Sequence, residues 1–141
     1  MVARFPRRLP AFLKGKRRIV DYDALAVELR KLRETVAGVT DTVIAAVDGI
    51  PIISDVADSV DPMNISALAA ANLGIARQAA EITRQGTLNQ TVVFSSGGYM
   101  AVYAIGRVAL LVVLGDSGLN LGRLLYESRP VTDRIGSILT P

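Results

Sequence analysis

Histidine and cysteine are both absent from this chain of 141 residues. Without cysteine the chain has no disulfide framework, no thiol nucleophile and no zinc site of the cysteine type. Without histidine it lacks the usual general base near neutral pH and the commonest metal ligand. Most hydrolase mechanisms are therefore excluded, and we expect no catalytic residue, no cofactor and no metal site.

Two short motifs suggest chemistry, but each lacks a part that the chemistry needs. Residues 115–118, of sequence GDSG, copy the residues that flank the nucleophile of trypsin-like serine proteases, yet no histidine can act as the base. A turn followed by a helix cap is the better interpretation. Asp55, Asp58 and Asp61 recur at every third residue, whereas a calcium-binding EF-hand alternates every second residue and ends in glutamate. They predict a solvated acidic loop.

The basic residues are concentrated at the start of the chain. The first twenty residues carry seven basic side chains and no acidic one, which leaves nine basic against thirteen acidic residues in the remainder. Pro6, Pro10 and Gly15 interrupt any helix there, so we expect residues 1–20 to be a disordered extension and residues 21–141 to form one domain. The basic residues of the extension are Arg4, Arg7, Arg8, Lys14, Lys16, Arg17 and Arg18.

Phe5, Leu9, Phe12 and Leu13 are interleaved with these charges. That mixture suits contact with an anionic membrane surface better than contact with nucleic acid, and the third interpretation is an inert solubilising arm. The longest aliphatic run, Val108–Leu114, is too short to span a bilayer. We therefore expect a cytoplasmic protein that reaches the inner membrane surface, if at all, only peripherally through its basic extension.

Hydrophobic spacing and turn residues predict the elements of the domain. Asp21 or Asp23 can cap a first helix, and Gly38 can end it. The pair Asp48-Gly49 predicts a hairpin with a tight two-residue turn. The expected helices are one with the core stripe Leu25, Leu29, Leu32 and Val36, one that begins near Pro62 and ends before Gly86, and one at Leu119–Ser128. The expected strands are Thr42–Val47, Ile50–Ser54, Gln90–Ser95, Tyr99–Ile105 and Val108–Leu114.

This order predicts an α+β fold with one five-stranded antiparallel sheet. The near-continuous apolar strands indicate that helices cover both faces of that sheet. Arg129-Pro130 is expected to kink or break the last helix, and a final amphipathic piece should follow it.

The second helix is apolar on nearly every side. Between Pro62 and Ala80 it carries a single formal charge, Arg77, whereas a helix with one wet face should alternate apolar and polar residues. We expect one stripe to lie on the protein's own core, namely Leu68, Asn72, Ile75, Ala79 and Ile82. The second stripe should then need a partner to cover it, namely Ala69, Ala70, Leu73, Ala76 and Ala80.

The order of elements, the Asp-Gly hairpin, the alanine-rich second helix and the Gly-Asp-Ser-Gly-Leu-Asn-Leu-Gly segment before the last helix together resemble the roadblock/dynein light chain family. The resemblance covers about residues 21–138 and is closest to the actinobacterial members that accompany a small Ras-like GTPase. It implies the roadblock/profilin-like fold, α-β-β-α-β-β-β-α. It also implies a homodimer in which the third strands pair and the second helices lie side by side, and in related bacterial regulators the paired helices receive the GTPase.

Carried onto this chain, the resemblance implies a dimer interface and a GTPase contact. The interface would contain the small-residue stripe of the second helix (Ala69, Ala70, Leu73, Ala76, Ala80) and the third strand (Gln90, Thr91, Val92, Val93, Phe94, Ser95). Arg77, Glu81 and Arg84 are candidates for contact with the GTPase, although a solvated helix face with internal ion pairs would carry the same residues.

The sequence therefore predicts a non-enzymatic homodimer that binds, and regulates or activates, a small Ras-like GTPase. The alternative is a structural dimeric scaffold of a membrane-associated signalling complex, anchored by its basic extension. An enzyme of unknown type is the third hypothesis, but neither a paired acid and base nor a nucleophile with its base is present in the sequence.

Overall fold

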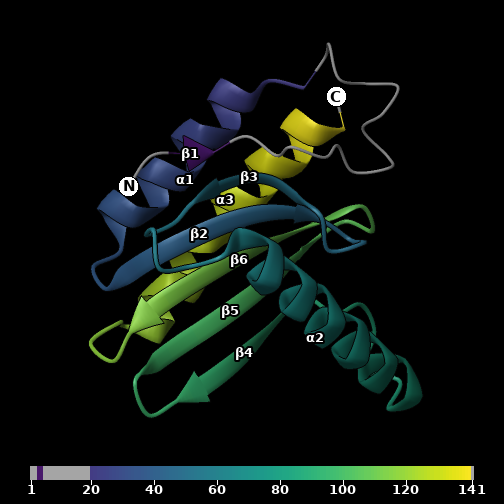
Figure 1. Ribbon diagram of the computed structural model, residues 1–141. Helices are drawn as coiled ribbons and strands as arrows, with labels where there is room; N and C mark the ends of the chain where they lie inside the picture. Colours follow the sequence, from purple (N-terminus) through teal and green to yellow (C-terminus); the bar gives the residue numbers. More distant parts are fainter. Residues whose placement is uncertain (1–2, 5–19, 141) are drawn as a thin grey trace.

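The computed structural model describes residues 3–4 and 20–140, which form one antiparallel sheet with helices on both faces (Figure 1). The spatial order of the strands is β1-β3-β2-β6-β5-β4. The strands are β1 (Ala3–Arg4), β2 (Val39–Ala46), β3 (Pro51–Asp55), β4 (Gln90–Ser95), β5 (Gly98–Ile105) and β6 (Ala109–Asp116), and the helices are α1 (Tyr22–Thr35), α2 (Pro62–Ile82) and α3 (Leu121–Leu139). The predicted five-stranded α+β fold is confirmed, and β1 adds a short sixth strand.

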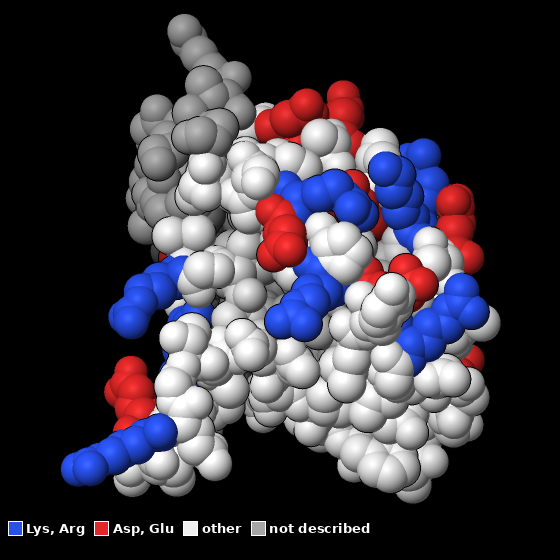
Figure 2. Space-filling model, turned by 180° about the vertical axis from the view of Figure 1, so that it is seen from behind, with Lys and Arg blue, Asp and Glu red and all other residues white. Residues whose placement is uncertain are grey.

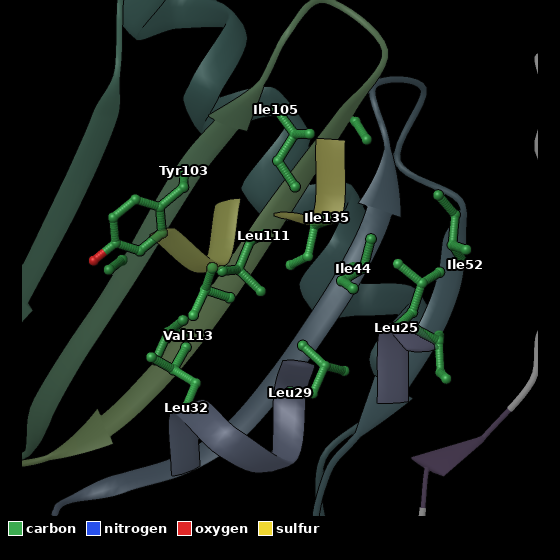
Figure 3. Close-up of a cluster of buried hydrophobic side chains, with 14 of the residues drawn as sticks. Leu25, Leu29, Leu32, Ile44, Ile52, Tyr103, Ile105, Leu111, Val113 and Ile135 are labelled. Carbon is green, nitrogen blue, oxygen red and sulfur yellow. The ribbon is translucent and has the colours of Figure 1, made fainter. Parts of the chain in front are cut away.

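Two apolar clusters lie on opposite faces of the sheet. The larger one joins α1 and α3 to the strands, and Figure 3 shows Leu25, Leu29 and Leu32 of α1 facing side chains of β2, β5, β6 and α3. The smaller one lies under α2, which crosses the other face in Figure 1, and contains Ala69 and Leu73. The sheet is therefore the central layer, with α1 and α3 on one side and α2 alone on the other.

The first helix follows its sequence signals closely. Asp21 is its N-cap and accepts a hydrogen bond from the Ala24 N–H at 3.0 Å, which satisfies one of the free N–H groups of the first turn. The predicted stripe is buried in full, because residues three and four apart lie on one face of a helix. Its members Leu25, Leu29, Leu32 and Val36 are at most 1% exposed.

The turn between β2 and β3 is longer than the sequence predicts. The Ala46 N–H donates to the Ile50 carbonyl oxygen and the Gly49 N–H donates to the Ala46 carbonyl oxygen, both at 2.9 Å. Residues 47–49 therefore form the loop, and Gly49 adopts a φ of +87°, which glycine reaches at the lowest cost. The prediction of a tight two-residue turn is wrong, since the pair Asp48-Gly49 also suits a three-residue loop that ends in left-handed glycine.

The strand β1 was not predicted. Ala3 and Arg4 pair antiparallel with Asp55 and Ser54 of β3, so these two residues belong to the sheet. The other basic residues of the extension, from Arg7 to Arg18, lie outside the described residues, and its disorder stays a prediction.

The last helix is continuous, and the predicted break at Pro130 is wrong. Pro130 lies inside α3 and cannot donate to the Tyr126 carbonyl group one turn earlier. Both residues are exposed, so water can satisfy that carbonyl oxygen. The apolar stripe runs through the proline at helical spacing, because the buried residues before and after it are Leu124, Ser128, Val131, Ile135 and Leu139.

Two ion pairs fasten α1 to its neighbours. Glu28, only 4% exposed, accepts a hydrogen bond from the Arg134 guanidinium of α3. Arg33 pairs with Asp55 at the end of β3, so Asp55 is buried and its assignment to a solvated acidic loop is wrong. Asp61, from the same predicted acidic loop, is the N-cap of α2, and its side chain accepts a hydrogen bond from the Met63 N–H at 3.0 Å. Removing one partner of a buried ion pair leaves an uncompensated charge, so the two ion pairs of Glu28 and Arg33 fix the position of α1.

Replacing Pro130 with alanine should stabilise the protein. The variant Pro130→Ala restores one helical hydrogen bond, and we expect the free energy of unfolding to rise by about 1–2 kcal/mol. This gain is smaller than the full penalty of a proline inside a helix, because alanine also increases the conformational entropy of the unfolded chain. Urea denaturation followed by circular dichroism measures the change. Pro62→Ala is the matched control, since proline is favoured in the first turn of α2 and its loss should give no gain. A loss of stability in Pro130→Ala would contradict a continuous α3.

Candidate protein-protein interface

The burial of α2 is the reverse of the prediction. Ala69 and Leu73, expected to meet a partner, are 0% and 1% exposed because they pack on the sheet of their own chain. In the expected core stripe, Leu68, Ile75 and Ile82 are 62%, 69% and 82% exposed. The other members of the predicted partner stripe are half-buried, namely Ala70, Ala76 and Ala80. Of the other members of the predicted core stripe, Ala79 is exposed and Asn72 is half-buried.

The reason for the reversal is the close approach of α2 to the β2–β3 hairpin. A Cβ atom on Gly49 would lie 3.2 Å from the Ala67 Cα, so the N-terminal half of the helix has little room beneath it. Small side chains on the inner face, Ser66 and Ala69, permit this approach. The larger side chains are consequently left on the outer face.

The three most exposed large apolar residues of α2 lie in a row. Leu68, Ile75 and Ile82 are spaced by seven residues, which is close to two full turns, so they follow nearly one line along the helix. Ala71 and Ala79 are also exposed and lie beside this line. We call these five residues the outer stripe of α2. Full burial of one leucine or isoleucine side chain is worth about 1.5–3 kcal/mol, so the stripe is a strong candidate for a covered surface.

The strand β4 is the second uncovered feature. It is the last strand of the sheet, and its six residues include no charged side chain and no proline. Natural proteins usually protect an open strand edge with charge, proline or a covering segment. Val93 and Phe94 are 36% and 75% exposed, and the Phe94 ring stacks on Tyr99 of β5 with centroids 4.8 Å apart. The edge is therefore open to pairing with another strand.

The candidate GTPase-contact residues lie toward the C-terminal end of α2. The Arg77 guanidinium donates to the Gly106 carbonyl oxygen at 2.9 Å, which ties the helix to the β5–β6 turn. Arg77 and Glu81 also line a pocket of about 290 Å³ together with Arg107. Arg84 follows the end of the helix with a φ of 56°. Arg84 therefore lies outside the helix, although the sequence predicts that the helix continues almost to Gly86.

The GDSG motif is a turn. The Asp116 carboxylate accepts from the Gly118 N–H at 2.9 Å, and the Asn120 side chain caps α3 by accepting from the Arg123 N–H at 3.0 Å. Gly115 approaches Leu119 so closely that a Cβ atom there would lie 2.6 Å from its side chain. The predicted turn and helix cap are confirmed, and Asn120 is the cap. Across residues 3–4 and 20–140, no cluster of acidic residues could hold a metal ion.

An open uncharged strand edge and a helix with an apolar outer face define a small α+β interaction domain. The sequence of residues 25–115 matches the Roadblock/LC7 domain. The chain therefore belongs to the Roadblock/LC7 family, as its resemblance to the roadblock/dynein light chain proteins implied.

Known proteins support this assignment at two levels. An uncharacterized protein of Methanocaldococcus jannaschii is 31% identical over 113 residues, which are 80% of this chain and 95% of the relative. The crystal structure of a Roadblock/LC7 domain from Streptomyces avermitilis has a TM-score of 0.74 at 22% identity, with 79% of this chain and 94% of that chain covered. Myxococcus xanthus MglB has a TM-score of 0.77 at 16% identity, with 84% and 90% covered. At such identities the two structures establish the fold.

A negative charge introduced by substitution should have a different effect on the inner face of α2 than on its outer face. The variant Leu73→Glu places a carboxylate in the monomer's own core, and we expect it to abolish folding. Ile75→Glu alters only the outer stripe, so the fold should persist, but any assembly that buries the stripe should dissociate. Circular dichroism reports the fold, and light scattering reports the mass. An unfolded Ile75→Glu together with a folded Leu73→Glu would contradict the face assignment.

Proposed function

We propose that this protein is a non-catalytic homodimeric adaptor that binds, and regulates, a small Ras-like GTPase. The observation that carries the proposal is the outer stripe of α2, an apolar row that this chain leaves in water. Within the described part of the chain, no element covers Leu68, Ile75 or Ile82. A second copy supplies the simplest cover, because a helix whose outer stripe carries no charge can pack against its twin without a charge conflict.

The two uncovered features support a single symmetric interface. The helix α2 contacts β4, so the outer stripe and the open edge belong to the same side of the molecule. A twofold axis beside β4 would join two sheets edge to edge and place the two α2 helices on one face of the joined sheet. An interface of this kind is closed, because each copy uses the same patch. The charge-poor sequence of α2 and β4 fits such a self-complementary contact.

The GTPase is proposed from family membership and from the polar end of α2. Glu81 and Arg84 are exposed at this end, and Arg77 holds it against the β5–β6 turn. A dimer would present two such polar ends beside its paired helices. Charged groups at the rim of an interface chiefly influence association rate and specificity, so these residues suit recognition of a partner rather than catalysis.

Binding to the GTPase can be tested with a matched pair of arginine variants. A small Ras-like GTPase from the same organism, loaded with GDP or a GTP analogue, should bind the wild-type dimer in at least one nucleotide state. Arg84→Glu should weaken binding by about tenfold with unchanged dimer mass, because it reverses a charge at the proposed rim. Arg30→Glu is the control, since Arg30 is exposed on α1 across the sheet. Calorimetry measures both, and a competent wild-type dimer that binds in neither state would contradict the proposal.

A second proposed role is that of a scaffold anchored at a membrane surface. Its support is the charge distribution, with seven basic and no acidic residues among the first twenty. No helix in residues 3–4 or 20–140 has the length and apolar character to cross a bilayer.

Anionic vesicles test this second role directly. The full chain should sediment with vesicles that contain phosphatidylserine, and deletion of residues 1–18 should abolish sedimentation, because each basic residue near an anionic surface contributes about 1 kcal/mol. Neutral phosphatidylcholine vesicles are the control. Equal sedimentation of the full and shortened chains would contradict anchoring by the extension.

A further inference from the structure

The hydrogen bonds between β4 and β5 determine which backbone groups of β4 point outward. The Ala104 N–H donates to the Asn89 carbonyl oxygen at 2.9 Å, and the register continues from this pair to the β4–β5 turn without a shift. Hydrogen-bonded and non-hydrogen-bonded pairs alternate along antiparallel strands. Thr91, Val93 and Ser95 therefore form the hydrogen-bonded pairs with β5.

The remaining β4 residues, Gln90, Val92 and Phe94, direct their N–H and C=O groups to the open edge. The stacking of Phe94 on Tyr99 agrees with this assignment, because cross-strand side chains lie closest in non-hydrogen-bonded pairs. The side chains of the same three residues share one face of the sheet, since alternate residues of a strand point the same way. It is the face of α1 and α3, because Val92 packs against that cluster.

These constraints select one register for pairing with a second copy. Antiparallel pairing uses all three outward-facing residues only when Val92 lies opposite Val92 of the second copy. Gln90 then lies opposite Phe94 of the second copy, and the twofold axis passes beside Val92. A slip of two residues in either direction loses one of the three hydrogen-bonded pairs. A slip of one residue would place inward-facing groups at the edge and opposite side chains on different faces.

A groove lies beside Gln90 on the face of α1 and α3. Its volume is about 520 Å³, and its lining includes Gln90 and Tyr103 from the sheet and Leu125, Tyr126 and Arg129 from α3. Tyr126 is 79% exposed. The Tyr103 hydroxyl is buried near the Ser128 side chain of α3, and Figure 3 shows it pointing away from the other labelled side chains. Burial raises the pKa of Tyr103 above its usual value of 10.0, and the contact with Ser128 opposes part of that rise.

The surface around the groove changes character toward β4. Figure 2 shows this face from behind, with charged side chains of both signs over its middle and no charged side chain at its lower right. The lower right corresponds to the β4–β5 hairpin, in which residues 90–105 contain no charged side chain. Phe94 and Tyr126 are thus two large aromatic side chains exposed on this face. Neither strand of the β4–β5 hairpin carries a charged residue near them.

We propose that Phe94 of each copy enters the groove of the other copy and packs between Gln90 and Tyr126, an inference that rests on the homodimer proposed above. Gln90 lines the groove, and in this register its Cβ atom lies about 5 Å from the Cβ atom of Phe94 of the second copy. The Phe94 ring therefore lies beside the groove. An offset or edge-to-face contact with Tyr126 then buries two aromatic rings that the single chain leaves in water. The groove is complete only in the dimer, because the second copy supplies its apolar contents.

Disulfide trapping tests the register in a chain that has no native cysteine. In the proposed register the two Val92 Cα atoms lie about 5.5 Å apart, which suits a disulfide. The two Val93 residues lie on a diagonal of about 7–8 Å, which is too far. Mild oxidation should therefore cross-link Val92→Cys rapidly and Val93→Cys poorly, and the Thr91→Cys/Val93→Cys double variant should cross-link again.

The outcomes separate this inference from the proposed function. Rapid cross-linking of Val93→Cys alone would mean a shifted register and would overturn the inference while leaving the dimer intact. A dimer by light scattering that cross-links at none of these positions would overturn it as well, because β4 would not be the interface. A wild-type monomer would overturn both the inference and the homodimer on which it rests.

The aromatic contact has its own test by analytical ultracentrifugation. Phe94→Ala and Tyr126→Ala should each raise the dimer dissociation constant about tenfold or more, and the double variant should cost less than the product of the two changes, because the rings contact each other. Val47→Ala is the control, since Val47 is 44% exposed in the β2–β3 turn, and it should leave the constant within about twofold. Independent effects of the two aromatic substitutions would contradict the contact.

Discussion

The sheet of this protein can cover only one face of α2, and α2 is apolar on two. The inner face uses small residues such as Ala69 to approach the β2–β3 hairpin, where Gly49 leaves just enough room. The outer face consequently carries Leu68, Ile75 and Ile82 into water. No rotation of the helix removes the conflict, because either face would leave an apolar row behind. The proposal of a second chain therefore rests on the composition of one helix.

The two edges of the sheet differ in a way that directs this second chain. At the β3 edge, Ala3 and Arg4 pair with Ser54 and Asp55, Pro51 removes one donor, and Asp55 forms an ion pair with Arg33. At the β4 edge, residues 90–95 have no proline and no charge. Strand addition is thus blocked by proline, charge and a short covering strand at one edge and left open at the other. A protein with one open edge can form a closed dimer, whereas two open edges would permit a growing chain of copies.

The sequence predicts the elements of this fold better than it predicts their faces. The stripe of α1 is recognisable because Leu25, Leu29 and Leu32 alternate with charged residues, and the GDSG turn is recognisable from its glycines. The facing of α2 is not, since both stripes are apolar and the choice depends on the tertiary fit near Gly49. Pro130 is tolerated because its side of α3 faces water. The open edge of β4 could be inferred only through family resemblance, since strand order is a long-range property.

Most of the stabilising contacts of the described residues lie on the face of α1 and α3, away from α2. The described ion pairs, Arg33 with Asp55 and Glu28 with Arg134, fasten α1 to β3 and α3, and the larger apolar cluster lies on that face. The face of α2 has the smaller cluster, and α2 carries only Arg77 and Glu81 as charges. Since the core depends little on the outer face of α2, substitutions there can alter partners without unfolding the domain. That arrangement would let the proposed dimer form while its helices still face the proposed further partner.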